Sequence, residues 1–333
     1  MGAHHFLPRR RVALGGLAAA GLATALPGLA QSPASRFPER PITLLVPFGP
    51  GGIADLTARA VSGQMAKTLG VAIVVDNKPS AGSIVASQAA ASARPDGHTL
   101  LLMSNGNAVS VGLFKKLPYD TQKDFAPITT LGYFDLGIFV PAGSRFAALR
   151  DAVAFAKANP GRLNVATITP GSTQHLAAKL FETVAGIDVV TVPYKGSPAV
   201  LQALRAGEAD LAFEILGPMV AQVGAGVVRA LAVSSSQRNP ALPDVPTVGQ
   251  AGVAGYDVAS WNALAAPAGT PPEVIDRLGR AAREAVATPA VREKLGRLGV
   301  RLQAGTPADM QALLAAEIRR WGEVIRKAGI EPE

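Results

Sequence analysis

The chain of 333 residues has no cysteine and little histidine. Without cysteine, a disulfide framework, a thiol nucleophile, a zinc site built from thiolates and the lipid-bearing cysteine of a lipoprotein are all excluded. Of the four histidines, only His98 and His175 follow residue 30, and they do not form a pair at the spacing of metal ligands. We therefore expect no metal site.

Aromatic residues are also few, at 5% of the chain, and the basic residues are spread out rather than clustered. Binding of nucleic acid requires a basic stripe with stacking aromatic side chains, so no nucleic-acid partner is expected. The formal net charge of +8 falls to +5 without the first 30 residues, which hold three arginines and no acidic residue. A mild positive charge favours small anions as partners.

No apolar run reaches the roughly 20 residues that a membrane-spanning helix needs. Three arginines at residues 9–11 precede an apolar run at residues 12–26, which Pro27 ends, and residues 28–30 have the small-x-small pattern of a cleavage site. We interpret residues 1–30 as a cleavable secretory signal rather than a membrane anchor. The residues after the arginines match the twin-arginine (Tat) motif poorly. Export by the Sec route is therefore favoured over Tat, and the mature protein is expected in a bacterial periplasm.

A strand–loop–helix layout occurs twice in the chain. An apolar strand at residues 42–46 enters a loop rich in proline and glycine, which opens a helical pattern that runs to about residue 69. The layout recurs with a strand at residues 163–168, a loop at 169–173 and a helix at 174–185. Each unit aims a helix N-terminus, with unpaired N–H groups and a partial positive charge, beyond the end of its strand. Two such units that face each other across a cleft would hold a small anion.

The alternation of strands and helices along the chain predicts α/β domains with largely parallel sheets. In such sheets ligands bind beyond the carboxyl ends of the strands. A Pro-Ala-Gly-Ser segment near residue 141 marks a crossing into a second domain, and a Pro/Gly-rich passage at residues 240–255 leads back. We therefore expect one domain at residues 37–139 plus 259–333 and another at 140–258, with the cleft and the hinge between them.

Eight segments carry a resemblance to one known family. They are residues 46–52 (VPFGPGG), 93–97 (ARPDG), 156–161 (AKANPG), 171–177 (GSTQHLA), 192–196 (VPYKG), 229–233 (RALAV), 242–247 (LPDVPT) and 266–271 (APAGTP). In this order, over about residues 37–330, they resemble the solute-binding proteins of tripartite tricarboxylate transporters, also called the Bug family.

The resemblance implies a periplasmic binding protein of type II, with two α/β domains, a ligand cleft between them and a hinge of crossing strands. Such a protein closes on one small ligand and delivers it to a permease of one large and one small membrane subunit. Known ligands of the family are mostly carboxylates, including dicarboxylates, tricarboxylates, acidic amino acids and aromatic acids. Neither catalysis nor a cofactor comes with the family, and we expect a monomer.

Other functions were weighed against this one. A sensor that presents the same bound acid to a two-component receptor would use identical binding chemistry, so the sequence leaves it open. A binding protein of another uptake class is disfavoured by the family motifs. An exported serine hydrolase is disfavoured because the chain has no Gly-x-Ser-x-Gly elbow and because neither His98 nor His175 has a visible orienting acid.

Family members hold a ligand carboxylate through backbone N–H groups and bound waters, and the two loops here contain no arginine or lysine. Glycines let the backbone approach an anion closely, and hydroxyl groups add donors. The candidate ligand-binding residues are Phe48, Gly49, Pro50, Gly51, Gly52, Ile53, Asn105, Thr169, Gly171, Ser172, Thr173, Gln174, His175, Tyr194, Lys195 and Glu214.

Some of these roles stay open. Asp55 is expected to support its helix start rather than touch the ligand. His175 either orients its loop or contacts the ligand. Asn105 and Glu214 lie at predicted strand ends, and for each of them both ligand contact and a structural role are open. An acid at Glu214 would repel a second carboxylate unless protonated and would favour an amino or hydroxyl group on the ligand. Only Gly82 remains of a run that is richer in glycine in the family, which suggests an atypical ligand.

Overall fold

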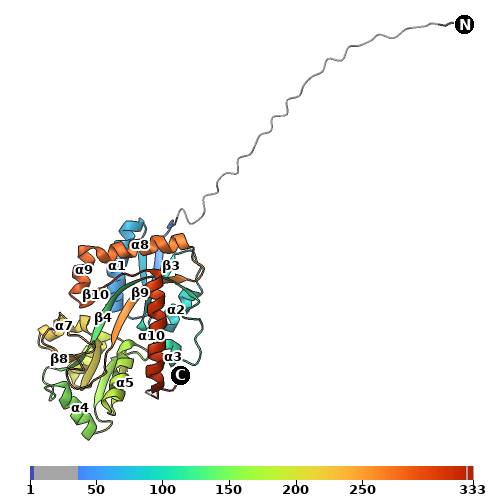
Figure 1. Ribbon diagram of the computed structural model, residues 1–333. Coiled ribbons are helices and arrows are strands. Elements are labelled where there is room, and N and C mark those ends of the chain that lie inside the picture. Colours follow the sequence, from blue (N-terminus) through green and yellow to red (C-terminus); the bar gives the residue numbers. More distant parts are fainter. Residues whose placement is uncertain (4–36, 328, 333) are drawn as a thin grey trace.

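The computed structural model describes residues 1–3, 37–327 and 329–332. The predicted signal peptide, apart from its first three residues, lies outside the described residues. Strands and helices alternate along the rest of the chain and form two lobes (Figure 1).

The first lobe holds a mixed sheet. Its strands are β1 (Ile42–Val46), β2 (Ile73–Asn77), β3 (Thr99–Ser104), β9 (Ala259–Pro267), β10 (Val300–Leu302) and the first part of β4 (Phe125–Pro141). The strands β2, β1 and β3 are parallel neighbours, and β9 lies antiparallel to both β3 and β4. The short β10 also pairs antiparallel with β4.

The second lobe is built around the other end of β4. Its strands are β5 (Asn164–Ile168), β6 (Val190–Tyr194), β7 (Leu211–Ile215) and β8 (Val228–Val233). β5 pairs in parallel with β6 and β7, whereas β7 and β8 run antiparallel to β4. The loops that follow β1 and β5 therefore both begin at carboxyl ends of parallel strands, where ligands bind in such sheets.

One strand joins the lobes. β4 pairs with β9 as far as Asp135, and from Leu136 onward it pairs with β7 and β8. Ser234 ties this point together, since its Oγ accepts from the Leu136 N–H at 3.0 Å and donates to the Val258 carbonyl at 2.6 Å. The change of partner thus falls inside β4, four residues before the predicted domain boundary at residue 139. That boundary remains a prediction.

Helices cover both faces of the first sheet. They are α1 (Ile53–Leu69), α2 (Ile84–Ala91), α3 (Asn105–Leu113), α8 (Pro272–Ala287), α9 (Pro289–Gly296) and α10 (Pro307–Lys327), with a 3₁₀ turn at Ala81–Ser83. Side chains of β3 alternate between the two faces. Leu100 and Leu102 join a core that includes residues of α1 and α8, while Leu101 and Met103 join a core with α2 and α10.

The second sheet is covered in the same way. Its helices are α4 (Leu149–Ala158), α5 (Thr173–Ala185), α6 (Ser197–Ala206) and α7 (Leu216–Gly224). Val165 of β5 packs in the core that contains residues of α4 and α5, and its neighbour Ala166 packs with residues of α6 and α7. Each lobe is therefore a three-layer α/β unit.

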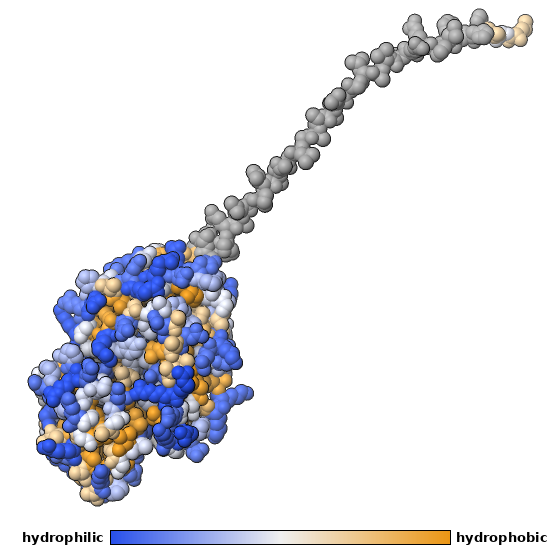
Figure 2. Space-filling view, viewed as in Figure 1, coloured by the Kyte–Doolittle hydropathy of each residue, from blue (hydrophilic) through white to orange (hydrophobic). Residues whose placement is uncertain are grey.

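The face shown in Figure 2 carries mostly hydrophilic side chains, with apolar patches between them. Exposed aliphatic side chains are single valines such as Val74, Val85 and Val190. Within residues 37–327 and 329–332, no helix combines the length and the apolar character that crossing a membrane would require.

Candidate ligand-binding cleft

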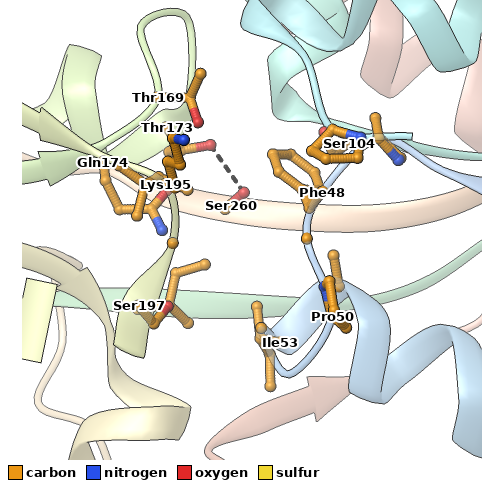
Figure 3. A pocket seen from close by; sticks show the side chains of 18 of the residues that line it. Phe48, Pro50, Ile53, Ser104, Thr169, Thr173, Gln174, Lys195, Ser197 and Ser260 are labelled. Atoms are coloured by element: carbon orange, nitrogen blue, oxygen red, sulfur yellow. Dashed lines mark hydrogen bonds between the residues drawn. The ribbon is translucent and has the colours of Figure 1, made fainter. Parts of the chain in front are cut away.

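A cavity of about 270 Å³ lies between the lobes and is lined by residues of both. Phe48, Pro50 and Ile53 face Gln174 and Lys195 across it, as Figure 3 shows. Ser260 of β9 lies between the two sides, behind the cavity in this view.

The lobes touch on more than one side of this cavity. The Gly82 N–H points at the Pro170 carbonyl at 3.5 Å. Gly171 has a φ of +79°, and a Cβ there would lie 3.1 Å from the Gly82 nitrogen, so only glycine suits this close approach. Elsewhere a Cβ on Gly49 would lie 3.8 Å from the Lys195 carbonyl oxygen. The two lobes are therefore in contact in this structure.

The loop between β1 and α1 is held by a buried carboxylate. Asp55, 2% exposed, accepts from the Gly51 N–H at 3.0 Å and from Arg59 Nε at 3.0 Å through Oδ2. Asn77 Nδ2 donates to Asp55 Oδ1 at 3.0 Å and to the Phe48 carbonyl at 2.9 Å. Asp55 thus organises the loop from behind, in the supporting role that the sequence suggested.

These contacts also set the charge of Asp55. Burial would raise the pKa of its carboxyl, but the hydrogen bonds from Arg59, Gly51 and Asn77 outweigh burial and hold that pKa below its usual value. Asp55 is consequently ionised at neutral pH, and its negative charge is balanced by Arg59, which does not line the cavity.

The loop between β5 and α5 is held by hydroxyl and amide groups. Ser172 caps α5, since its Oγ accepts from the His175 N–H at 3.2 Å. Thr173 Oγ1 lies 2.9 Å from Ser260 Oγ and accepts from Asn105 Nδ2 at 3.3 Å. These contacts tie the second lobe's loop to β9 and α3 of the first lobe.

Behind this loop lies a second buried carboxylate. Gln174 Nε2 donates to Glu214 Oε1 at 2.8 Å, and the Ile215 N–H donates to the same oxygen at 2.7 Å. Glu214 is fully buried, and its Oε2 has no hydrogen-bond partner among the described residues. Burial raises the pKa of Glu214, and the donors from Gln174 and Ile215, together with the nearby Ser197 hydroxyl, offset this only in part.

Several helices begin at the cavity. The capping residues of α1 (Gly52), α3 (Ser104), α6 (Gly196) and α7 (Ile215) all line it, as does the first residue of α5, Thr173. Such ends carry partial positive charge and backbone donors.

The starts of α1 and α5 present unpaired donors. In the described part of the chain, the N–H groups of Ile53 and Ala54 in α1 and of Thr173 and Gln174 in α5 have no hydrogen-bond partner. All four residues line the cavity. The arrangement supplies four backbone donors from two lobes to one space.

The rest of the lining is largely apolar and almost uncharged. Phe134, Ile168 and Ile215 contribute apolar surface beside Phe48 and Ile53. Among the described residues that line the cavity, the exposed Lys195 is the sole charged one. Groups of three or more His, Asp and Glu residues that would suit a metal ion are absent from the described part of the chain.

Nine of the sixteen candidate residues line the cavity: Phe48, Gly49, Pro50, Gly52, Ile53, Thr169, Thr173, Gln174 and Lys195. The other seven lie outside the lining. Gly51, Gly171 and Ser172 shape the two loops, and Asn105 and Glu214 are buried behind Thr173 and Gln174.

The two remaining candidates point elsewhere. Tyr194 directs its hydroxyl toward Glu208, at 3.5 Å. His175 is largely buried; burial, aided by the nearby Lys179, lowers its pKa to about 4, so the ring is neutral at pH 7. Its Nδ1 has no hydrogen-bond partner among the described residues.

The part of the cavity lining that β3 and β9 provide was not predicted from the sequence. Ser104, Ser260 and Asn262 line the cavity from these strands. The one available signal was the alternation along β9: Trp261 packs in a core cluster, so its neighbours at 260 and 262 face the other way. That alternation does not by itself tell which face meets a cavity.

Comparisons with known proteins agree with this architecture. The family described as "Tripartite tricarboxylate transporter family receptor" matches residues 57–330. The structure of the periplasmic binding protein BugD superposes with a TM-score of 0.85 at 31% identity, over 89% of this chain and 100% of that one. "R. palustris Rpa4515 with adipate" gives 0.85 at 32% identity, over 89% and 100%.

A third structure, "MatC (Rpa3494) from Rhodopseudomonas palustris with bound malate", gives a TM-score of 0.82 at 34% identity, over 87% of this chain and 100% of that one. The predicted α/β fold of a periplasmic binding protein is thereby confirmed, and so is the resemblance from which it came. These relatives bind solutes and are not enzymes. The chain belongs to the tripartite tricarboxylate transporter receptor family of periplasmic solute-binding proteins.

Proposed function

We propose that this protein captures a small carboxylate between the N-termini of α1 and α5 and delivers it to the membrane subunits of a tripartite transporter. The observation that carries the proposal is that Ile53, Ala54, Thr173 and Gln174, whose N–H groups are unpaired, all line one cavity. Structures of two relatives are named for bound adipate and malate, which are both carboxylates.

The energetics suit an anion. A hydrogen bond to a charged group contributes about 1.5–3 kcal/mol net, and a helix end contributes roughly 0.3–1 kcal/mol, rising to about 2 where it is partly buried. Four such bonds and two helix ends are enough to offset the roughly 4–15 kcal/mol that association costs. A buried arginine is not needed, and the exposed Lys195 would attract the anion on its way in.

Both lobes contribute donors, which links binding to closure. The donors of α1 belong to the first lobe and those of α5 to the second, so an anion between them stabilises the closed arrangement over an open one. β4 and the segment from Ser234 to Val258 cross between the lobes and would serve as the hinge. The large and small transporter subunits would then recognise the closed form.

The first experiment is a binding screen on the mature protein. Protein unfolded and refolded to remove carried-over ligand is tested by thermal shift and calorimetry against carboxylates, their amides, sugars, amines and phosphate. A ligand at a hundred times its Kd stabilises by about 2.7 kcal/mol, which raises Tm by several degrees. We expect a shift with at least one carboxylate that is lost with its amide. A response to sugars or amines alone would contradict the proposal.

A further inference from the structure

Three uncharged polar side chains form one wall of the cavity. Ser260 and Asn262 come from the same face of β9, and Ser104 lies beside Asn262 in the register of β3 and β9. The hydroxyl of Ser260 is already bonded to Thr173 of the other lobe. This group of residues 104, 260 and 262 is called the β3–β9 wall below.

Asn262 is the unusual member of this wall. Its side chain is 1% exposed, and neither Oδ1 nor Nδ2 has a hydrogen-bond partner among the described residues. Buried amide groups nearly always have partners, because an unpaired donor or acceptor in a buried site is costly. Since Asn262 lines the cavity, its partner is expected to come from there.

We propose that Asn262 binds an uncharged group of the solute that both donates and accepts a hydrogen bond, such as a hydroxyl or a carboxamide. The inference rests on the proposed function, in which the helix ends hold the solute's carboxylate. It adds the chemistry of the other end of the molecule. The solute is then a monocarboxylate with a remote hydroxyl or amide rather than a dicarboxylate.

The reason lies in what an amide offers. A carboxylate only accepts hydrogen bonds, so a second carboxylate at this wall would leave the Asn262 Oδ1 unpaired and facing a negative oxygen. Lys195 belongs to the loop before α6 in the second lobe and not to this wall. An ammonium group only donates, and it would find no carboxylate here because Glu214 is buried behind Gln174 and does not line the cavity.

The surroundings determine the rest of the solute. Apart from the helix starts and the β3–β9 wall, the cavity lining consists mainly of aromatic, aliphatic and proline side chains, among them Phe48, Phe134, Ile168 and Ile215. Apolar surface buried against such groups is favourable, whereas additional polar groups would be desolvated without partners. The middle of the solute is therefore expected to be a hydrocarbon chain or ring.

The test compares probes that differ at one end only. Calorimetry measures the Kd values of a diacid, its monoamide, the matching ω-hydroxy acid and the plain acid, for chains of four to six carbons and for the benzoate series. We expect the best monoamide or hydroxy acid to bind about tenfold or more tightly than the diacid and plain acid of the same length, as in sites built around a hydrogen-bonding group.

Asn262→Leu then removes the amide but keeps a similar volume. The Kd of the monoamide or hydroxy acid should then become about equal to that of the plain acid. The Kd of the plain acid itself should stay within about threefold of the wild-type value. Ser260→Ala should reduce the preference less. Ser62→Ala, a change at a buried serine of α1 that does not line the cavity, should leave it intact.

The wild-type ranking decides the proposal even if Asn262→Leu does not fold. A diacid or a plain acid that binds most tightly overturns it, and so does an unchanged preference in a folded Asn262→Leu variant. Both outcomes leave the carboxylate-binding function standing. If the carboxylate-binding function itself were wrong, no member of any series would bind, so the two failures can be told apart.

Discussion

The loop before α1 and the loop before α5 face the same cavity, yet buried carboxylates support them in opposite ways. Asp55 is paired with Arg59, and its pKa lies below the usual value. Glu214 has neutral partners, namely Gln174, the Ile215 N–H and the nearby Ser197 hydroxyl, and burial raises its pKa. One loop is positioned by a balanced charge and the other by an acid that is poorly compensated.

The two loops are also held in place differently at their helix starts. Gly52 caps α1 without a side-chain acceptor, so the first loop depends on Asp55 to fix Gly51 and Asn77. Ser172 caps α5 itself, so Glu214 is left to orient Gln174. Replacing the acid by its amide should therefore lower the free energy of unfolding at Asp55 and leave it unchanged or raise it at Glu214.

The largest effect is expected for Asp55→Asn. The amide would lose the charge that balances Arg59 and one of the acceptor positions that bind Gly51, Arg59 and Asn77. We expect the free energy of unfolding at pH 7 to fall by about 2–3 kcal/mol. Urea denaturation of the ligand-free protein measures this loss.

The matched control for that change is Asp76→Asn. Asp76 pairs with Lys78 on the surface, with side-chain exposures of 41% and 35%. Surface pairs contribute about 0–1 kcal/mol, so stability should change little. If the two variants lost equal stability, the special role of Asp55 in the first loop would be refuted.

The next effect concerns the backbone donors. Ile53 and Thr173 are the first residues of α1 and α5, and the residues before them are extended, as the residue before a proline prefers. Proline at these positions keeps the helix but removes one N–H. Relative to Ile53→Ala and Thr173→Ala, which share the loss of the side chain, each proline should weaken carboxylate binding by about tenfold.

Calorimetry with the tightest carboxylate measures both pairs of variants. A loss at position 173 without one at position 53 would show that the second loop alone holds the anion. Equal affinities of the proline and alanine variants at both positions would exclude these N–H groups from the site.

A smaller effect, of opposite sign to that of Asp55→Asn, is expected for Glu214→Gln. The amide oxygen can still accept from Gln174 and from the Ile215 N–H, and the buried charge disappears. The free energy of unfolding at pH 7 should stay the same or rise by up to about 1 kcal/mol. A loss of more than about 1 kcal/mol would show that the ionised carboxylate stabilises the second loop.

The pH dependence of the free energy of unfolding tests the sign of the Glu214→Gln effect independently. The pKa of Glu214 is raised on folding, so the folded state binds its proton more tightly and stability is lost as pH rises from the unfolded pKa, about 4.3, through the folded one. The advantage of Glu214→Gln should therefore shrink as pH falls toward 4. For Asp55 the pKa is lowered, so its contribution is present above about pH 3.9 and is lost as pH falls through the folded pKa.

The smallest effect is expected for Tyr194→Phe. The hydroxyl points to Glu208 and lies outside the cavity, although the sequence placed Tyr194 among the ligand-binding candidates. We expect the Kd of the tightest carboxylate to change by less than about twofold. A tenfold change would mean that the second lobe moves on binding and brings Tyr194 into the site.

The sequence predicted the parts of the fold that have local signals. The strand at residues 42–46 was expected with the observed bounds, and the helix at 174–185 to within one residue of its start, because apolar patterns and the neighbouring proline- and glycine-containing loops mark them. α3 was missed because Asn105-Gly106-Asn107 is typical of a turn. In the structure Ser104 and Asn107 form a capping box that starts a helix there.

The residues of the candidate site were likewise predicted only where local sequence signals mark them. Proline, glycine and hydroxyl residues mark the two loops, so Phe48, Gly52 and Thr173 were found. Asn262 was not, because nothing in its neighbourhood in the sequence shows that β9 crosses behind the cavity. That position follows from the pairing of β9 with both β3 and β4, which depends on contacts between distant segments.

The most direct test of the shared anion site is a crystal structure with the tightest-binding carboxylate. The account predicts carboxylate oxygens within about 3.2 Å of backbone nitrogens from both helix starts, Ile53 or Ala54 on one side and Thr173 or Gln174 on the other. A carboxylate bound to Lys195 alone, with these four N–H groups directed at other partners, would contradict it.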